Sequence, residues 1–297
     1  MAKIIDGKEI ASEIKDELKL KVEKLKQEYG SVPGLAVVLV GDDPASAVYV
    51  RMKGKGCDEV GLRSFQYILP EETTEIELLG LIEELNTQDE VDGILVQLPL
   101  PKHINETAVI YAINPNKDVD GFHPVNTGKL VIGDDGLFAC TPLGCQEMIY
   151  RNVKDLKGKH LVVVGRSNIV GKPVANMMLQ KNDRANCVVT VCHTAAKDLS
   201  VYTREADILV VAAGRPNTVT ADMVKEGVVV IDVGVNRISD PENPEKTRLV
   251  GDVSFEEVAE KASAITTVPG GVGPMTIAML LQNTVKAFEM KKNRSNA

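Results

Sequence analysis

The stretch KHLVVVGRSNIVGKP (residues 159–173) decides the fold, because four apolar residues run into a glycine turn that leads into a proline-containing segment. Residues 161–164 have the composition of a buried parallel strand, and Gly171 and Pro173 open a predicted helix. A glycine turn between a strand and a helix N-terminus favours pyrophosphate, because the backbone comes close and the helix dipole attracts negative charge. Ser167 replaces the middle glycine of the usual G-x-G-x-x-G motif. The stretch predicts a dinucleotide site, and an ordinary βα turn is the alternative.

Apolar runs typical of buried parallel strands lie on both sides of this stretch. They occupy residues 35–40, 64–69, 93–98, 188–192, 208–212, 228–233 and 264–267. Segments with helical signals separate them, at residues 10–29, from 43 onward, and at 74–85, 142–150, 254–261 and 275–290. This alternation predicts an α/β fold with two domains, the second Rossmann-like with a parallel sheet. The helix from residue 43 is expected to fray at Gly54 and Gly56, residues 114–140 to form a long loop, and the tail from 291 to fray.

Composition excludes several classes of function. The 297 residues suit two domains, and 44% hydrophobic residues are enough for two cores. A net charge of -8 argues against nucleic-acid binding, and no apolar run is long enough to span a membrane. The N-terminus is charged from its third residue, so no secretory signal is expected. Five cysteines without a C-x-x-C pair predict reduced thiols in a cytoplasmic protein, with no metal and no disulfide.

Several polar side chains are candidates for catalysis. Tyr49 and Lys53 are four residues apart and share a helix face, and a lysine near other cations can act as an acid or base. The alternative is a solvated lysine on an amphipathic helix. Gln97 lies near the carboxyl end of a strand, where ligands gather in α/β sheets, although it can also bond a loop. Asp118 and Asp120 can accept hydrogen bonds from a donor-rich heterocycle or can form Asx turns.

The residues alone do not assign a function to one glycine-rich segment and one pair of cysteines. The segment PGGVGPMT from Pro269 lacks the G-K-[ST] of a P-loop, so triphosphate hydrolysis is not expected. Its glycines allow close approach to a ligand or a tight crossing of the chain. Cys140 and Cys145 invite a role as nucleophile, but no base is identifiable beside them, and buried structural thiols are the alternative.

The second strand of the predicted dinucleotide fold indicates which cofactor binds. NAD-binding proteins usually carry an acid at its end, to accept hydrogen bonds from the ribose 2′-hydroxyl. Here the strand ends in His193 and Thr194, and Arg166 lies in the neighbouring turn. This arrangement favours the 2′-phosphate of NADP, while the alternative for Arg166 is a solvated loop cation.

Seven motifs, taken together and in this order, span almost the whole chain. They are YVRMKGKGC from Tyr49, DGILVQLPLP from Asp92, KDVDGFHPVNTGKL from Lys117, CTPLGC from Cys140, GRSNIVGKP from Gly165, DVGVNR from Asp232 and PGGVGPMT from Pro269. In them the chain resembles the bifunctional methylenetetrahydrofolate dehydrogenase/methenyltetrahydrofolate cyclohydrolase family. The serine in place of glycine in the dinucleotide turn is also a feature of that family.

The resemblance implies an activity and roles for individual residues. Methylenetetrahydrofolate would be oxidised with NADP+ to the methenyl compound, which would be hydrolysed to 10-formyltetrahydrofolate, in one-carbon metabolism that serves purine biosynthesis. Lys53 would handle the proton, Tyr49 would stack on the folate, Gln97 would hold the lysine, and Asp120 would grip the pterin ring. Further substrate contacts are implied for Val96, Leu98, Pro269, Gly270, Gly271, Val272 and Gly273. Cofactor contacts are implied for Gly165, Arg166, Ser167, Ile169, Thr194 and Val235.

The resemblance also implies domain limits and assembly. Residues 1–139 with 275–297 would form the folate-binding catalytic domain, and residues 140–274 the NADP-binding domain. A homodimer is expected. Two alternatives are a dehydrogenase of this fold without the hydrolytic step and a sensor that binds NADP without turnover. Both are expected to lack the set of Tyr49, Lys53 and Gln97, which is intact here.

Overall fold

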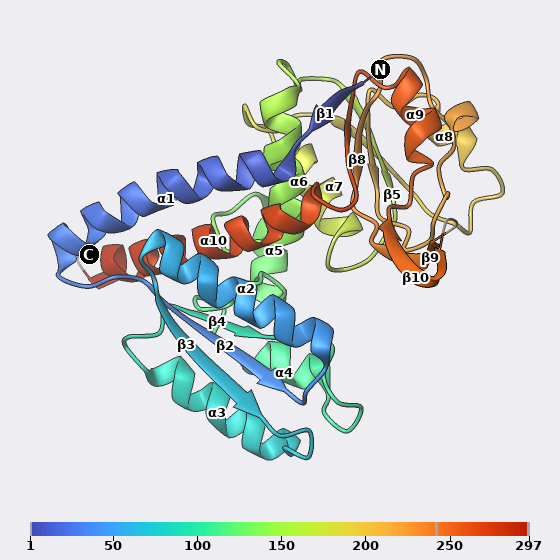
Figure 1. The fold of residues 1–297 in the computed structure, drawn as a ribbon. Coiled ribbons are helices and arrows are strands. Elements are labelled where there is room, and N and C mark those ends of the chain that lie inside the picture. The colour runs from blue at the N-terminus through green and yellow to red at the C-terminus, as the bar shows by residue number, and fades with distance from the viewer. Residues whose placement is uncertain (1, 241–242, 296–297) are drawn as a thin grey trace. The chain divides into compact units, whose positions relative to one another are not determined.

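The computed structural model describes residues 2–240 and 243–295 (Figure 1). The chain divides into two compact units. The three-stranded unit contains residues 12–140 and the chain from Ile277 onward, and the six-stranded unit contains the residues up to Ala11 and residues 141–276. The expected limits differ in the first eleven residues and, by one or two residues, at the boundaries near Cys140 and Thr276. The first eleven residues join the six-stranded unit because β1 (Lys3–Ile5) pairs in parallel with β11 (Ala264–Thr266).

The three-stranded unit is built on a parallel sheet of order β3-β2-β4. The central strand β2 is buried along its whole length, as expected for an uninterrupted apolar run with a neighbour on each side. The strands are β2 (Gly34–Val40), β3 (Arg63–Leu69) and β4 (Gly93–Val96). The helices that lie wholly or largely in this unit are α1 (Gly7–Tyr29), α2 (Pro44–Val60), α3 (Glu75–Thr87), α4 (Glu106–Ala112), α5 (Pro124–Ile132) and α10 (Val272–Ser295). The predicted strands and the helices α1, α2 and α3 are confirmed to within a few residues.

Helix α2 does not fray at its two glycines, contrary to the expectation from sequence. A Cβ at Gly54 would lie 2.2 Å from Nε2 of Gln66 on β3, and one at Gly56 would lie 3.2 Å from Cδ1 of Leu281 on α10. Packing against β3 and α10 therefore offsets the low helix propensity of glycine. The helix ends at Gly61, which has a φ of 82°.

Two further segments are more regular than the sequence indicates. Residues 124–132 form α5 within the stretch expected to be a loop, with His123 as N-cap, Pro124 in the first turn and Gly133 as C-cap with a φ of 80°. These capping signals were present in the sequence, but the polar residues around them hid the helix. Residues 291–295, expected to fray, continue α10.

The six-stranded unit has an all-parallel sheet of order β1-β11-β8-β7-β5-β6. Strand β5 lies between β6 and β7, so the chain reverses its direction of winding beside β5 and the predicted doubly wound fold is confirmed. The remaining strands are β5 (His160–Val164), β6 (Val188–Cys192), β7 (Ile208–Val211) and β8 (Val229–Asp232), and a separate antiparallel hairpin consists of β9 (Asn236–Asp240) and β10 (Asn243–Val250). The helices are α6 (Cys140–Asn152), α7 (Gly171–Leu179), α8 (Ser200–Thr203), the 3-10 helix η1 (Ala221–Met223) and α9 (Phe255–Lys261). Strand β1 and the hairpin were not predicted.

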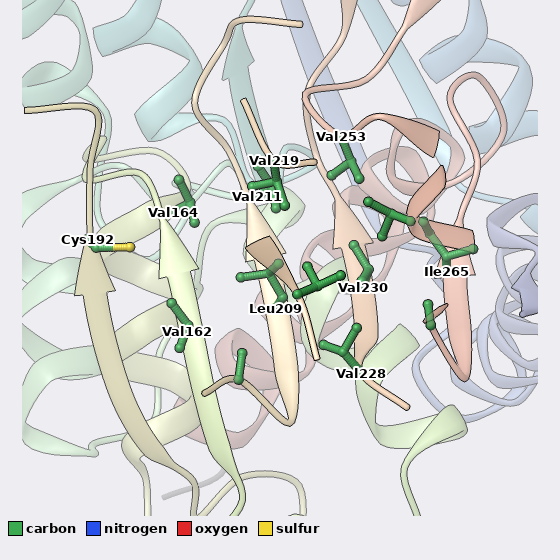
Figure 2. Packing of buried hydrophobic residues seen from close by; sticks show 14 residues of the cluster. Val162, Val164, Cys192, Leu209, Val211, Val219, Val228, Val230, Val253 and Ile265 are labelled. Carbon is green, nitrogen blue, oxygen red and sulfur yellow. The ribbon is translucent and has the colours of Figure 1, made fainter. Parts of the chain in front are cut away.

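One face of this sheet carries a core of small branched side chains (Figure 2). Alternate residues of each strand share a face, and the cluster takes every second residue of β5 and β7 and, from the residue just before it, of β8: Val162, Val164, Leu209, Val211, Val228 and Val230. Each of them is completely buried, which stabilises the unit by about 1.5–3 kcal/mol per side chain relative to exposure. Because the six strands of this sheet are all parallel, their carboxyl ends lie at the same edge of the sheet. In the described part of the chain, no helix is both long and apolar enough to cross a membrane.

Candidate functional site

Helix α2 places Tyr49 and Lys53 on one face, four residues apart. The helix begins where Asp43 accepts a hydrogen bond from the backbone N–H of Ser46, with Pro44 in the first turn. Tyr49 is 46% exposed, whereas Lys53 is only 8% exposed. A lysine this deeply buried is not the solvated surface residue that the helical spacing alone allowed.

The ammonium group of Lys53 is held by an amide. Its Nζ donates to Oε1 of Gln97 at 2.7 Å, and Nε2 of Gln97 donates to the carbonyl of Leu98 at 2.6 Å. The backbone N–H of Gln97 in turn donates to Val38 on the central strand at 2.8 Å. The amide is therefore oriented with its oxygen toward the lysine. This contact joins two residues that are separated by 44 positions in the sequence.

Asp120 and Cys140 complete the electrostatic surroundings of Lys53. Burial lowers the pKa of Lys53, and the negative charge of Asp120 opposes this shift. Burial also raises the pKa of Asp120 to about 6, against the effect of the Lys53 charge. The pKa of the buried Cys140 thiol is raised well above its usual value, so this group stays protonated. The cluster thus combines a lysine that loses its proton more readily with a carboxyl group that keeps its proton more strongly.

The paired acids of the KDVDG segment have different environments. Asp118 is buried and accepts hydrogen bonds from the backbone N–H groups of Gly121 at 3.2 Å and His123 at 2.9 Å, and from Nδ2 of Asn126 at 2.9 Å. It therefore shapes the loop that leads into α5, as an Asx turn would. Asp120 is the acid whose charge interacts with Lys53. This difference separates the two aspartates, which the residue pattern alone did not distinguish and of which the resemblance selects Asp120.

Asn283 on α10 is a buried residue of this cluster that the sequence did not reveal. Its Nδ2 donates to the carbonyls of Val119 and Phe138, both at 2.8 Å, and lies 3.7 Å from Sγ of Cys140. The contact fixes the backbone next to Asp120. Its only signal in the sequence is a polar residue within an apolar helical stretch. Among residues 2–240 and 243–295, no group of His, Cys, Asp or Glu side chains is arranged to hold a metal ion.

The remaining residues implied for the substrate lie in two places. Val96 ends β4, and Leu98 follows Gln97 before a cis bond to Pro99. Pro269, Gly270, Gly271, Val272 and Gly273 belong to the six-stranded unit. There Gly271 donates to the carbonyl of Thr267 at 2.9 Å, and a Cβ at Gly7 would lie 1.8 Å from the Gly271 carbonyl oxygen. The glycines thus permit a tight crossing within that unit, and α10 begins at Val272, three residues earlier than expected.

The turn after β5 crosses the chain so closely that two positions must be glycine. Gly165 has a φ of 140°, and a Cβ there would lie 2.3 Å from the carbonyl oxygen of Ala212 after β7. A Cβ at Gly171 would lie 2.3 Å from the carbonyl oxygen of Gly165. Oγ of Ser167 accepts from the backbone N–H groups of Val170 at 3.1 Å and Gly171 at 3.3 Å. The serine side chain thus binds the N–H groups of the N-cap residue Val170 and of Gly171 at the start of α7, which gives a physical reason for its presence in place of glycine.

The other residues implied for the cofactor follow strands of the same sheet. Thr194 comes two residues after β6 and Val235 three residues after β8, so both lie at the carboxyl edge with the Gly165 turn. Arg166 and Thr194 are exposed, Ile169 is 50% exposed and Val235 is 59% exposed. An exposed cation and exposed apolar side chains around a glycine turn at the switch point fit a dinucleotide.

The doubly wound sheet and its glycine turn are typical of a unit that binds a nicotinamide nucleotide. The other unit buries a lysine against an amide, as catalytic sites often do. Together they indicate a nicotinamide-nucleotide-dependent enzyme of two α/β units. Family models agree: residues 5–120 match the catalytic domain of tetrahydrofolate dehydrogenase/cyclohydrolase, and residues 139–292 match the NAD(P)-binding domain of the same family. The chain belongs to the tetrahydrofolate dehydrogenase/cyclohydrolase family.

Individual relatives match over nearly their full length. The "Bifunctional protein FolD" of Prosthecochloris aestuarii is 58% identical over 98% of this chain and 99% of its own length. The crystal structure of the bifunctional FolD methylenetetrahydrofolate dehydrogenase/cyclohydrolase of Campylobacter jejuni is 51% identical, with a TM-score of 0.91 over 98% of this chain and 100% of that chain. The Trypanosoma brucei enzyme, solved with NADP and an inhibitor, is 39% identical, with a TM-score of 0.90 over 98% of both chains.

Proposed function

We propose that this chain oxidises 5,10-methylenetetrahydrofolate to 5,10-methenyltetrahydrofolate with NADP+ and then hydrolyses the product to 10-formyltetrahydrofolate. The observation that carries the proposal is the contact between Lys53 and Gln97 beside Asp120, in a chain that belongs to a dehydrogenase/cyclohydrolase family. The intact cluster favours the bifunctional enzyme over a dehydrogenase without the hydrolytic step, and over a sensor that binds NADP without turnover.

The hydrolytic step requires a group that moves a proton near neutral pH. Water attacks the methenyl carbon and loses both of its protons, one to the proton-transfer group and one to N5, as the bond between this carbon and N5 breaks and the formyl group stays on N10. We assign the proton transfer to Lys53, because burial lowers its pKa and thereby raises the fraction of neutral amine. Gln97 keeps Nζ in place through its Oε1. Asp120 would bind the pterin, whose ring nitrogens are donors, and the exposed ring of Tyr49 would stack on the folate.

The dehydrogenase step depends mainly on orientation, since hydride acceptance is the chemistry that NADP supplies when bound. Gly165 would allow the cofactor phosphates to approach the backbone, and the exposed Arg166 would pair with the 2′-phosphate. No acid stands at the end of β6 to select NAD. Ser167, Ile169, Thr194 and Val235 would line the cofactor. We assign the six-stranded unit to NADP and the three-stranded unit to folate, with Val96 and Leu98 as further substrate contacts.

We further propose a homodimer in the cytoplasm, as part of one-carbon metabolism that serves purine synthesis. All five cysteines are free and buried, which suits a reducing compartment. A mass measurement in solution by light scattering should give twice the chain mass, and a single-chain mass would contradict the dimer.

One assay tests the activity. Purified protein is mixed with methylenetetrahydrofolate and either NADP+ or NAD+, and formation of the methenyl compound and its decay to the formyl product are followed separately. We expect both steps, with NADP+ preferred. Methenyl compound that accumulates and decays no faster than without protein would exclude the cyclohydrolase, and no methenyl compound with either nucleotide would exclude the dehydrogenase.

A further inference from the structure

Two buried aspartates of the six-stranded unit have no part in the proposed chemistry. Asp232 is the last residue of β8 and is 4% exposed, and Asp252, between β10 and α9, is completely buried. Among the described residues, no ion pair reaches either carboxylate. Burial of a carboxylate without a cation is costly unless hydrogen bonds satisfy it. Their partners therefore indicate what the two residues do.

Asp252 connects two loops that follow neighbouring strands. Its Oδ2 accepts from the backbone N–H groups of Ala213 at 2.6 Å and Gly214 at 2.8 Å, directly after β7. Its Oδ1 accepts from Nδ2 of Asn236, after β8, at 2.8 Å. One carboxylate thus holds the backbone of one loop and a side chain of the next. Hydrogen bonds to a charged acceptor are about twice as strong as neutral ones.

Asp232 holds the segment that carries Asp252. Its Oδ1 accepts from the backbone N–H of Gly234 at 3.0 Å and of Asp252 at 2.9 Å, and its Oδ2 accepts from Val253 at 3.0 Å. The two carboxylates also require glycine in each other's segment. A Cβ at Gly234 would lie 2.1 Å from Cγ of Asp252, and one at Gly251 would lie 1.8 Å from Oδ2 of Asp232.

The loops held in this way border the proposed dinucleotide site. Ala212, just before the backbone held by Asp252, is the residue whose carbonyl oxygen excludes a Cβ at Gly165. Val235, 59% exposed, lies between Gly234 and Asn236, both of which contact the aspartates. We infer that Asp252, supported by Asp232, is a positioning residue that fixes the loops after β7 and β8 in the shape that NADP requires. The inference rests on the proposed function of this unit.

The main test replaces Asp252 by asparagine. In Asp252→Asn the side chain keeps only one oxygen that can accept hydrogen bonds. This oxygen can accept either from the two backbone N–H groups or from Asn236, so one of these two contacts is lost. We expect the Kd for NADP+, measured by calorimetry, to rise about tenfold. Hydrolysis of the methenyl compound in the absence of NADP should keep its kcat and KM, since that reaction uses no dinucleotide. Hydrogen exchange at the amides of Ala213 and Gly214 should become faster.

Matched variants separate positioning from folding. Glu260→Gln, an exposed change of the same charge on α9, should leave the Kd unchanged. Asn236→Ala removes the side-chain hydrogen bonds to Asp252 and to the carbonyl of Gly251 but leaves the contacts of Asp252 with Ala213 and Gly214, and it should raise the Kd about threefold with normal folding. If Asp252→Asn loses both NADP binding and hydrolysis, the variant is unfolded and Asn236→Ala decides, because an unchanged Kd there overturns the inference. An unchanged Kd in Asp252→Asn overturns it as well. A wild-type protein that binds no NADP+ would refute the proposed function instead.

Discussion

Each of the two units contains a cluster of buried titratable side chains, and the two clusters are built differently. In the three-stranded unit, Lys53 and Asp120 have opposite charges, each reducing the pKa shift that burial imposes on the other. In the six-stranded unit, Asp232 and Asp252 have like charges and accept their hydrogen bonds chiefly from backbone N–H groups. Burial raises the pKa of Asp232 to about 6, and the charge of Asp252 adds to this shift.

The difference shows that the hydrogen-bond partners of a buried charged side chain indicate whether it is structural or catalytic. The carboxylates of the six-stranded unit are occupied by the backbone, so they fix the shape of loops. Lys53 is held through one of its three N–H donors by Gln97, and an ammonium group with further donors can meet a substrate. A perturbed pKa alone would not separate the two cases, whereas the hydrogen-bond partners do.

The largest expected effect tests whether the lysine cluster is catalytic. Lys53→Met should lower the rate of methenyl hydrolysis by about 10²- to 10⁴-fold, because the proton-transfer group is removed. Affinity for NADP+ should stay nearly intact. Lys55→Met, on the same helix but with an 80% exposed side chain, is the matched control and should hydrolyse normally. Cyclohydrolase activity retained in Lys53→Met would refute the assigned role.

The next effect tests the cofactor side of the comparison. Arg166→Ala should weaken NADP+ binding about thirtyfold, since a charge-assisted contact with the 2′-phosphate is lost, and should change NAD+ binding little. Lys181→Ala, which removes an exposed charge from the same unit, controls for net charge. Titration with both nucleotides measures the effect. An equal loss with NADP+ and NAD+ would eliminate the 2′-phosphate assignment.

A third effect is a dependence of stability on pH. The pKa of Asp232 is raised from its ordinary value of 3.8 to about 6 in the folded protein. Between these two pH values, folding is therefore accompanied by the uptake of a proton. The stabilisation from this group is complete below the ordinary pKa and is lost as the pH rises through about 6. The free energy of unfolding of wild type relative to Asp232→Asn should therefore fall by about 2 kcal/mol from pH 4 to pH 7. Urea titrations at several pH values measure it, and a difference that stays constant or grows would contradict the shifted pKa.

The smallest effect distinguishes glycines that the aspartates require from glycines that have free space. Nothing lies within 4 Å of a Cβ at Gly80 on α3, so Gly80→Ala should stabilise the protein by about 0.5–1 kcal/mol. Gly251→Ala should instead destabilise it, because the new Cβ meets Oδ2 of Asp232. Melting temperatures give both signs. Equal shifts in the two variants would mean that the segment around Gly251 relaxes freely.

The sequence predicts most of the regular structure of this chain and less of its polar clusters. Buried parallel strands appear as apolar runs because both their faces are covered, so β2, β5, β7 and β8 were found. The hairpin of β9 and β10 was not, because its residues are polar and do not alternate. Helix α5 was hidden by polar neighbours despite its proline and glycine caps.

The residues of the candidate site were predicted chiefly from the resemblance of the sequence motifs to those of the family. Spacing placed Tyr49 and Lys53 on one face, but it could not bring Gln97 to Lys53 from another element. Asn283 and Asp252 were missed, since their hydrogen bonds reach backbone groups far away in the chain. Local sequence carries no signal for such contacts.

The composition of the two units has a consequence for biosynthesis. Neither unit is a continuous piece of chain, because the first residues belong to the six-stranded unit and those from Ile277 onward to the three-stranded unit. The sheet of β2, β3 and β4 leaves the ribosome long before α10, whose buried residues include Leu281, Val285 and Phe288. Until then, the surface that α10 covers stays open to solvent and to other chains. The protein is therefore expected to complete its three-stranded unit only after α10 has left the ribosome, with a greater need for chaperones during synthesis than its size suggests.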